Sequence, residues 1–461
     1  MSDLDCKLLV IGAGPGGYVC AIRAGQLGID TIIVEAAKVG GTCLNVGCIP
    51  SKALIHAANE FYDFSHCAAS PIGISASEVK IDLGQTIAWK DKIVTRLDNG
   101  VAGLLKRAKT RLISGTARFL DGKTIEVATD DGPQIIRAEN IVVATGSAPV
   151  ELAELPFGGD VISSTEALSL TELPENLAIV GGGYIGMEIG TAMAKLGAKV
   201  TIVELQGSVL PLYDAEIVKP VLKNLNKLGV EILVNSSAMG VHDGVLEIKN
   251  STGKSQRIKA DKILVTVGRR PRTGKIGLDE LSLTMDGAFI GIDEKCQTSM
   301  RGVFAIGDVT GEPMLAHRAM AQGEMVAEII AGKPRLWNKM CVPSVCFTDP
   351  EIVECGMSAV AAKSAGIEIK TGQFPLAANG RAMTMEQESG FVRVVARADN
   401  NLILGLQAVG GGISELSAAF SIAIEMGARL DDIGATIHAH PTLSEGLQEA
   451  CLKALGHAIH I

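Results

Sequence analysis

Aromatic residues are scarce in this sequence, and long apolar runs are missing from it. Phe, Trp and Tyr make up only 3% of its 461 residues, too few for the aromatic platforms on which proteins stack single-stranded nucleic acid. Hydrophobic residues make up 47%, yet none of their runs reaches the ~18 residues of a membrane-spanning helix. We therefore attribute the high apolar content to parallel sheets buried on both faces and to a subunit interface.

The charge balance also lacks a basic excess. Lys and Arg number 42 against 51 Asp and Glu, for a net charge of -9, so we expect neither nucleic acid nor a membrane surface as a partner. The first ten residues, MSDLDCKLLV, have neither a secretory signal pattern nor an Arg-rich transit pattern. Ten cysteines are scattered without the spacing of a disulfide scaffold, which fits a reducing compartment. We expect a bacterial cytoplasm, or an organelle matrix for a processed form.

What the sequence does contain is one pattern written twice. Residues 8–35 are LLVIGAGPGGYVCAIRAGQLGIDTIIVE and residues 177–204 are LAIVGGGYIGMEIGTAMAKLGAKVTIVE, which align without a gap. Each predicts a buried strand, a G-x-G-x-x-G turn, a helix and a second strand that ends in Glu. In such a unit the glycines admit a pyrophosphate at the helix N-terminus, and the final carboxylate binds ribose hydroxyls. The residues concerned are Gly12, Gly14, Gly17 and Glu35, and Gly181, Gly183, Gly186 and Glu204.

One G-x-G-x-x-G alone would be a weak signal, because glycine-rich turns are common in α/β proteins. Here both stand between a strand and a helix, with Glu 18 residues after the last glycine, which favours ligand binding over a structural turn. Two fingerprints imply two dinucleotides. A carboxylate at position 204 accepts a ribose 2′-OH but repels a 2′-phosphate, so the second site should prefer NAD(H) to NADP(H).

The rest of the chain predicts an α/β protein with two Rossmann-like dinucleotide-binding domains and a C-terminal α+β domain. Each half closes with a strand and a glycine turn, IVVATGSAP at 141–149 and ILVTVGRRP at 263–271, which supports duplicated units. In the first half, 77–109 has a helical pattern and 111–137 that of a small antiparallel excursion. We place domain boundaries at 1–150, 151–270, 271–340 and 341–461, since strands and helices alternate after about residue 341.

Cys43 and Cys48 lie in the glycine-rich segment GGTCLNVGCIPSK soon after the first fingerprint. Such a pair could be inert thiols, half of a metal site or a redox dithiol. Cys341 and Cys346 share the spacing but lie in a strand-like run, CVPSVCF, which favours buried thiols. A zinc site built from all four is disfavoured, because zinc knuckles use shorter spacings and polar loops. We expect no metal.

The segment GGTCLNVGCIPSKAL closely resembles the redox-active loop of the pyridine nucleotide-disulfide oxidoreductases, flavoproteins that use FAD, NAD(P)H and an active disulfide. The resemblance extends over essentially the whole chain. It includes both fingerprints, the Thr145-Gly146 turn, the GRRP turn, the Gly307-Asp308 turn and the C-terminal run HAHPTLSE. It implies that 1–150 binds FAD, 151–270 binds NAD, 271–340 completes the FAD site, and 341–461 forms the interface of a homodimer.

The resemblance also implies a role for individual residues. Cys43 would exchange with the substrate dithiol, while Cys48 would lie against the flavin as its charge-transfer thiolate. Lys52 would lie near the flavin N5, paired with Glu188, and a cation there would stabilise negative charge on the reduced ring. Asp308 would bind the ribityl chain, and Met314, Ala316 and His317 would line the flavin. The remaining contacts implied are Ala117, Thr145 and Gly146 for FAD, and Val267 and Gly268 for NAD.

Thiol exchange needs a thiolate, and therefore a base that takes a proton from the substrate. A His oriented by a carboxylate can do this near neutral pH. By the family pattern His440 is that base and Glu445 orients it, both from the partner subunit, whereas His438 is structural.

Two positions bear on the substrate. Family members that reduce glutathione or trypanothione usually have Ser where this chain has Leu443, and a Val-Pro-Lys-Lys-like run where it has Ile49 to Lys52. Leu443 and Ser51 favour the members that oxidise dihydrolipoyl groups of 2-oxo acid dehydrogenase complexes or of the glycine cleavage carrier protein, with NAD⁺ as acceptor. A reductase of another thiol substrate stays open, as does a binding scaffold or redox sensor. A scaffold, however, would need none of Cys43, Cys48, Lys52, Glu188, His440 and Glu445.

Overall fold

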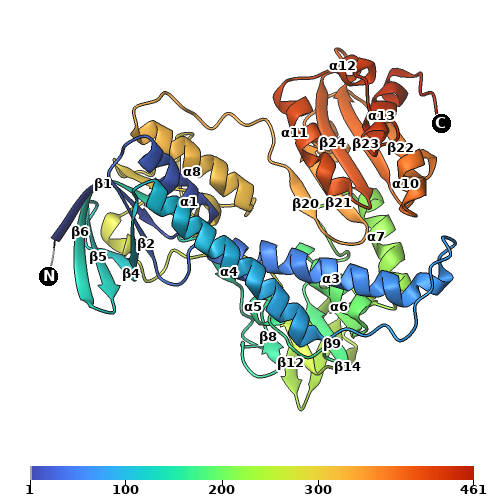
Figure 1. The fold of residues 1–461 in the computed structure, drawn as a ribbon, viewed down its shortest axis with the longest axis horizontal. Helices are drawn as coiled ribbons and strands as arrows, with labels where there is room; N and C mark the ends of the chain where they lie inside the picture. Colours follow the sequence, from blue (N-terminus) through green and yellow to red (C-terminus); the bar gives the residue numbers. More distant parts are fainter. Residues whose placement is uncertain (1–2) are drawn as a thin grey trace.

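A computed structural model describes residues 3–461, and its three largest sheets lie in separate lobes (Figure 1). The first sheet has the order β3-β2-β1-β6-β5-β4, with β19 pairing β6. Its strands are β1 (Asp3–Ile11), β2 (Thr31–Glu35), β3 (Arg111–Ser114), β4 (Thr116–Phe119), β5 (Thr124–Thr129), β6 (Gly132–Val143) and β19 (Val303–Ala305). The apolar strand β1 is central and pairs in parallel with β2 and β6. Helices α1 (Pro15–Gln26) and α8 (Ala316–Ile330) pack side by side on this lobe (Figure 1).

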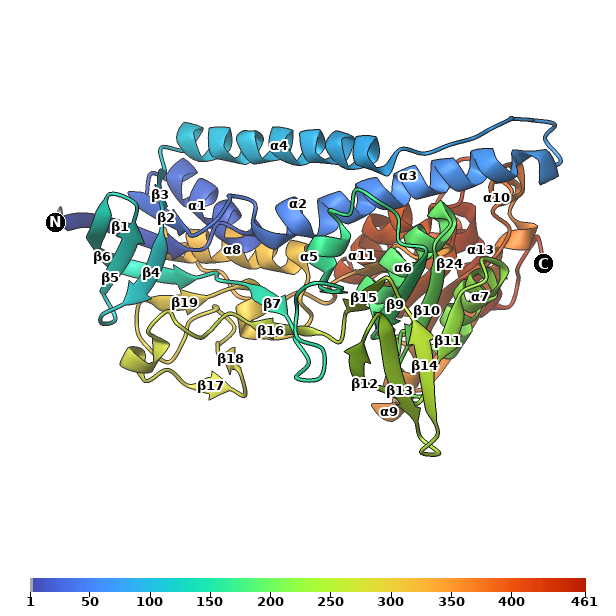
Figure 2. The same cartoon turned by 90° about the horizontal axis from the view of Figure 1, so that it is seen from below.

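The second sheet repeats the plan of the first. Its order is β11-β10-β9-β15-β8, with every pair parallel. The strands are β8 (Val161–Ile162), β9 (Asn176–Val180), β10 (Lys199–Val203), β11 (Glu231–Leu233) and β15 (Lys262–Val265), and the helices beside them are α5 (Ser164–Ala167), α6 (Tyr184–Leu196) and α7 (Ala215–Lys227). A three-stranded antiparallel sheet of β12 (Ser236–His242), β13 (Val245–Asn250) and β14 (Ser255–Lys259) extends from this lobe (Figure 2).

The third large sheet is antiparallel throughout, in the order β20-β21-β24-β23-β22. Its strands are β20 (Ser344–Cys346), β21 (Glu351–Gly356), β22 (Ile369–Pro375), β23 (Phe391–Arg397) and β24 (Ile403–Gly410). The helices of this lobe are α9 (Ala359–Ser364), α10 (Gly380–Thr384), α11 (Ser417–Glu425), α12 (Leu430–Ala435) and α13 (Glu445–Leu455). The predicted fold class, two Rossmann-like units followed by an α+β module, is confirmed.

The remaining short elements lie between or within these lobes. Strands β7 (Ser147–Pro149) and β16 (Arg269–Pro271) come from the two similar glycine turns and pair with each other. A small hairpin of β17 (Met285–Asp286) and β18 (Phe289–Ile290) follows. The 3-10 turns are η1 (Cys67–Ala69), η2 (Leu278–Leu281), η3 (Gly307–Thr310), η4 (Leu376–Ala378) and η5 (Ile413–Leu416).

Three helices connect the cysteine loop to the rest of the molecule. The short α2 (Gly41–Val46) leads into α3 (Cys48–His66), which extends from the first lobe to the second and packs on α6 (Figure 2). Helix α4 (Leu83–Arg107) lies over α3 and α1. The prediction of a helix from residue 77 was six residues too early, because the Asp82 side chain accepts from the N–H of Gln85 and caps the helix there.

The antiparallel excursion predicted for 111–137 was partly wrong. Strands β4, β5 and β6 are antiparallel as expected, but β3 pairs in parallel with β2 and extends the main sheet.

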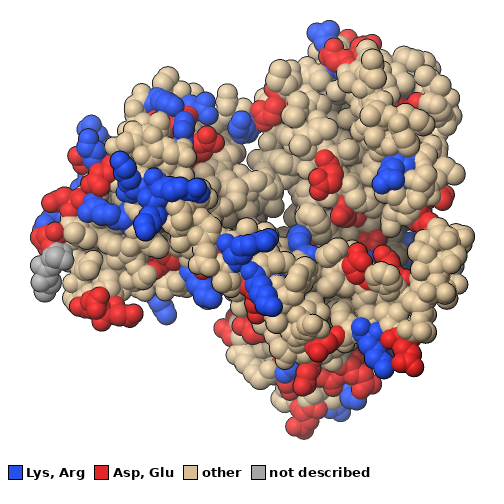
Figure 3. Space-filling view, viewed as in Figure 1, with Lys and Arg blue, Asp and Glu red and all other residues tan. Residues whose placement is uncertain are grey.

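On the face shown in Figure 3, Lys and Arg are interspersed with Asp and Glu over each lobe. Among the described residues, no helix has the length and apolar character needed to cross a bilayer.

Candidate active site

The two fingerprints have the same backbone geometry. Gly12 and Gly181 take φ of +100° and +107°, values that L side chains rarely adopt. Each donates its N–H to the last apolar residue of the following strand, at 2.8 Å to the carbonyl of Val34 and 2.8 Å to that of Val203. The repeated sequence therefore folds into a repeated turn.

The other fingerprint glycines divide into two kinds. A Cβ at Gly17 would lie 1.9 Å from the Gly12 carbonyl oxygen, and a Cβ at Gly186 would lie 2.3 Å from that of Gly181, so both are needed for the turn itself. At Gly14 and Gly183 a Cβ would meet no protein atom within 4 Å. These two are the N-cap residues of α1 and α6, whose N-termini have no side-chain cap. The uncapped N–H groups and the open space fit a pyrophosphate.

The carboxylates that end the second strands are also held alike. Glu35 accepts the N–H groups of Ala13 at 2.6 Å and Ala37 at 2.9 Å. Glu204 accepts those of Gly182 at 2.7 Å and Gln206 at 2.7 Å. Each carboxylate is therefore fixed beside its glycine turn and keeps lone pairs for ribose hydroxyls. The chain thus fits two dinucleotides at equivalent places.

These differences predict separate effects for two Ala substitutions in the first fingerprint. Gly17→Ala should destabilise the protein by roughly 1–3 kcal/mol, because its Cβ overlaps a backbone oxygen. Gly14→Ala should leave stability without cofactor nearly unchanged, since Gly14 has φ of -68° and free space, but should weaken FAD binding. Thermal unfolding of each variant without FAD measures its stability, and the rise in unfolding temperature on adding FAD measures cofactor binding. Equal losses of stability in the cofactor-free variants would contradict this division.

Cys43 on α2 and Cys48 at the first position of α3 line one pocket, and both are free thiols. The Cys43 thiol donates a hydrogen bond to the Cys48 sulfur, which lowers the pKa of Cys48 to about 7 although burial opposes this; the Lys52 charge lowers it further. The same bond and burial raise the pKa of Cys43. The pair is therefore set to hold one thiolate and one thiol, with the negative charge on Cys48.

Lys52 and Glu188 form an ion pair in the same pocket. The Lys52 Nζ lies one helical turn after Cys48 and 2.8 Å from Glu188 Oε2. The side chain of Glu188, on α6, is buried. The pair thus joins the cysteine helix of the first lobe to the fingerprint helix of the second, and it sets a positive charge beside the cysteines.

The structure brings most of the other expected flavin residues to this region. Asp308, Met314 and Ala316 line the cysteine pocket. Asp308 accepts the Ser147 hydroxyl at 2.5 Å, and Arg269 donates to that hydroxyl from its Nε at 2.8 Å. Sequence analysis missed Ser147 and Arg269 as supports of Asp308. The two similar segments contain both residues, Ser147 in IVVATGSAP and Arg269 in ILVTVGRRP, but the pattern did not indicate which partner either side chain would bind.

Four of the expected contacts lie in the glycine turns. Gly146 and Gly268 both have positive φ, and a Cβ on either would meet no protein atom. Thr145 donates its hydroxyl to the Arg272 carbonyl at 2.7 Å, and Val267 is partly exposed. Two other expected residues are not among those that line the cysteine pocket within residues 3–461: Ala117 is buried in β4, and the His317 ring contacts the Pro343 carbonyl at 2.8 Å.

His440 and Glu445 form a hydrogen-bonded dyad on the third lobe. His440 Nδ1 lies 2.8 Å from Glu445 Oε1, and the His440 side chain is 79% exposed. Burial raises the pKa of Glu445, but the N–H of Thr442 and the contact with His440 outweigh it and hold this pKa below its usual range. His438 lies 3.2 Å from the Ser444 hydroxyl. Among the described residues of this single chain, the dyad does not line the cysteine pocket.

Asn379, a further residue that was not identified from the sequence, holds the loop of this dyad. Asn379 is buried, accepts the N–H of Ala382 at 2.9 Å and donates to the Thr442 carbonyl at 3.1 Å. Its amide oxygen therefore caps α10, while its amide nitrogen holds the segment between His440 and Glu445. Only the position of Asn379 before a short helix could have marked it, as an N-cap.

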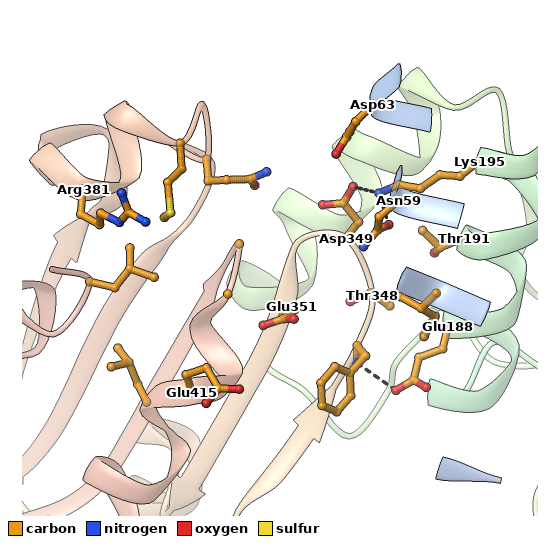
Figure 4. A pocket seen from close by; sticks show the side chains of 18 of the residues that line it. Asn59, Asp63, Glu188, Thr191, Lys195, Thr348, Asp349, Glu351, Arg381 and Glu415 are labelled. Carbon is orange, nitrogen blue, oxygen red and sulfur yellow. Dashed lines mark hydrogen bonds and ion pairs between the residues drawn. The ribbon is translucent and has the colours of Figure 1, made fainter. Parts of the chain in front are cut away.

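A cleft of about 550 Å³ separates the third lobe from α3 and α6. Figure 4 shows Arg381 and Glu415 on one side of it and Asn59, Lys195 and Glu188 on the other. Lys195 Nζ is 2.5 Å from Asp349 Oδ2 and 2.7 Å from Asn59 Oδ1 (Figure 4). The loop 441–444 that follows His440 also lines this cleft.

Comparisons with known proteins agree with this arrangement. A dihydrolipoyl dehydrogenase from Pseudomonas aeruginosa is 56% identical over 460 residues, covering 99% of both chains. One from Geobacillus stearothermophilus is 43% identical over 99% of this chain and 98% of its own. The crystal structure of LpdA from Mycobacterium tuberculosis superposes with a TM-score of 0.89 at 25% identity, covering 97% of this chain and 99% of that one.

The family comparison covers nearly all of the sequence. The model described as pyridine nucleotide-disulphide oxidoreductase matches residues 6–323. The model for the dimerisation domain of the same proteins matches residues 342–451. Together with the paired fingerprints and the cysteine pocket, these matches lead to one conclusion: the chain belongs to the pyridine nucleotide-disulphide oxidoreductase family.

Proposed function

We propose that the protein oxidises dihydrolipoyl groups and passes the electrons to NAD⁺, with FAD as its bound cofactor. The observation that carries this proposal is the Cys43–Cys48 pair in a pocket shared with the second fingerprint helix. Full-length relatives named dihydrolipoyl dehydrogenase, at 56% and 43% identity, support the dithiol substrate. Leu443 and Ser51 point to the same substrate among the family members that sequence analysis considered.

The chain's own residues would carry the thiol chemistry. With the pair oxidised, one substrate thiolate attacks the Cys43 sulfur and displaces Cys48 as thiolate. The second substrate thiol then displaces Cys43, which releases the cyclic disulfide and leaves both cysteines reduced. His440 accepts the proton of the attacking thiol, and Lys52 stabilises the Cys48 thiolate. Bound FAD supplies the two-electron carrier between this dithiol and NAD⁺.

His440 can serve in this way only if it reaches a cysteine pair. We infer that the working unit is a homodimer in which His440 and Glu445 of one subunit face the cysteines of the other. The match to a dimerisation domain supports this. So does the exposure of the dyad, which leaves the second ring nitrogen of His440 free to face a partner.

We further propose FAD binding by residues 1–150, NAD binding by 151–270, completion of the FAD site by 271–340 and dimerisation by 341–461. The return of β19 to the first sheet supports the third assignment. The partners would be lipoyl domains of 2-oxo acid dehydrogenase complexes or the glycine cleavage carrier protein. A reducing location, bacterial cytoplasm or organelle matrix, would suit the free thiols.

Steady-state NADH production from dihydrolipoamide tests the function and the Glu204 argument together. We expect fast turnover with NAD⁺ and a kcat/KM at least ~10-fold lower with NADP⁺, because the buried Glu204 carboxylate would face a 2′-phosphate. Glu204→Ser should narrow this difference. A yellow, NADH-reducible protein that ignores dihydrolipoamide would reject the substrate and keep the disulfide chemistry.

A further inference from the structure

Phe347 follows β20 of the third lobe and contacts both members of the Lys52–Glu188 pair. Its main-chain N–H donates to Glu188 Oε1 at 2.8 Å, the oxygen that Lys52 does not use. Its ring centroid lies 4.4 Å from Lys52 Nζ. In Figure 4 a dashed line at Glu188 marks the first of these contacts. One residue of the third lobe thus touches the anion through its backbone and the cation through its ring.

The ring is not placed as a core residue would be. Phe347 is only half-buried and lines the 550 Å³ cleft. Within the part of the chain that the structure describes, it belongs to none of the hydrophobic clusters, whereas its neighbour Cys346 does. An ammonium at this distance from an aromatic face is attracted by the ring quadrupole. The side chain of Lys52 is 34% exposed and pairs with only one oxygen of Glu188. The Phe347 ring therefore adds a second contact that holds the ammonium in place.

We propose that Phe347 is a positioning residue for the dithiol chemistry: its ring holds the Lys52 ammonium beside Cys48, and its N–H fixes the carboxylate that pairs with it. This role deepens the proposed function and rests on it, because the dithiol chemistry that Lys52 would serve is part of that function. The test below does not depend on it, since no thiol substrate is used. Phe347 also gives the third lobe a direct mechanical link to the cysteine pocket of the same chain.

The link has a definite electrostatic consequence. Lys52 favours the thiolate form of Cys48, so an ammonium that is free to move away would stabilise the thiolate less and raise its pKa. The other charged or titratable groups around Cys48 are Cys43 on α2, Glu188 and Tyr184 on α6, Arg269 on β16 and Asp308 on η3. None of them is altered by a change of the 347 side chain, so a shift in Cys48 titration would report on Lys52.

The test compares Phe347→Leu with Phe347→Tyr in the FAD-containing protein. Leu keeps an apolar side chain but has no π face, whereas Tyr keeps the ring. Each variant is reduced with one equivalent of dithionite, without any thiol substrate, and its long-wavelength charge-transfer absorbance is followed against pH. That absorbance reports the Cys48 thiolate and not turnover.

For Phe347→Leu we expect the midpoint to rise by about half a unit to one unit, a three- to tenfold loss of thiolate stability. Phe347→Tyr should titrate as the unsubstituted protein does. Unfolding temperatures serve as the control for simple packing damage, and Phe347→Met replaces the Leu variant if that protein does not fold. An unchanged midpoint in the Leu or Met variant would overturn the proposal, as would an equal rise in the Tyr variant. Failure of dihydrolipoamide as substrate would leave this test unaffected.

Discussion

Replacing His440 with Gln is expected to lower kcat/KM for dihydrolipoamide roughly 10²–10⁴-fold, the usual contribution of a general base. Gln retains a polar side chain of similar reach but cannot take up a proton near neutral pH. Glu445, whose pKa is held low by Thr442 and His440 against burial, stays ionised and keeps Nδ1 of His440 protonated. The opposite nitrogen of His440 is therefore the one available to accept the substrate proton.

His438→Gln is the matched control, because it changes a histidine two positions away that contacts Ser444. It should keep near-normal turnover. FAD content and the reduction of the bound flavin by NADH should be normal in both variants, since neither histidine lines the cysteine pocket of its own chain. Equal losses in the two variants, or full activity of His440→Gln, would show that the base lies elsewhere.

The parts of the fold that could be predicted from sequence are those decided by nearby residues. Gly12 and Gly181 adopt positive φ, and at Gly17 and Gly186 a Cβ would overlap a backbone oxygen. The strand–turn–helix unit can therefore be predicted from its own glycines. The same local logic placed Glu35 and Glu204 at the ends of their strands. The N-cap of α4, Asp82, is also a local signal. It was overlooked because the helical sequence pattern extends back to residue 77, before the first helical residue, Leu83.

Contacts between distant segments could not be predicted in this way. The return of β19 to the first sheet joins residues about 160 positions apart, and no periodicity encodes that pairing. Phe347 and Asn379 were missed because each acts through a segment remote in sequence, the Lys52–Glu188 pair and the loop after His440. The pairing of Lys52 with Glu188 was expected only from the family resemblance, since 136 positions separate them.

The two cysteine pairs show what residue spacing alone cannot predict. Cys43–Cys48 and Cys341–Cys346 have identical spacing, yet Cys43 and Cys48 line an open pocket together with Lys52, whose charge lowers the pKa of Cys48. Burial raises the pKa of Cys341, and it raises that of Cys346 as well, where Glu188 adds to the effect. Spacing alone therefore does not distinguish a redox pair from structural thiols; the glycines around Cys43 did, because they leave room for a ligand.

The disulfide relay is tested most directly by Cys48→Ser. A serine cannot form the disulfide, so dihydrolipoamide–NAD⁺ turnover should fall to the background of the assay, while FAD stays bound because its fingerprint is intact. Cys341→Ser, which changes a partly exposed thiol of the other pair, should retain activity. Turnover by Cys48→Ser at a rate close to that of Cys341→Ser would contradict electron transfer through the Cys43–Cys48 pair.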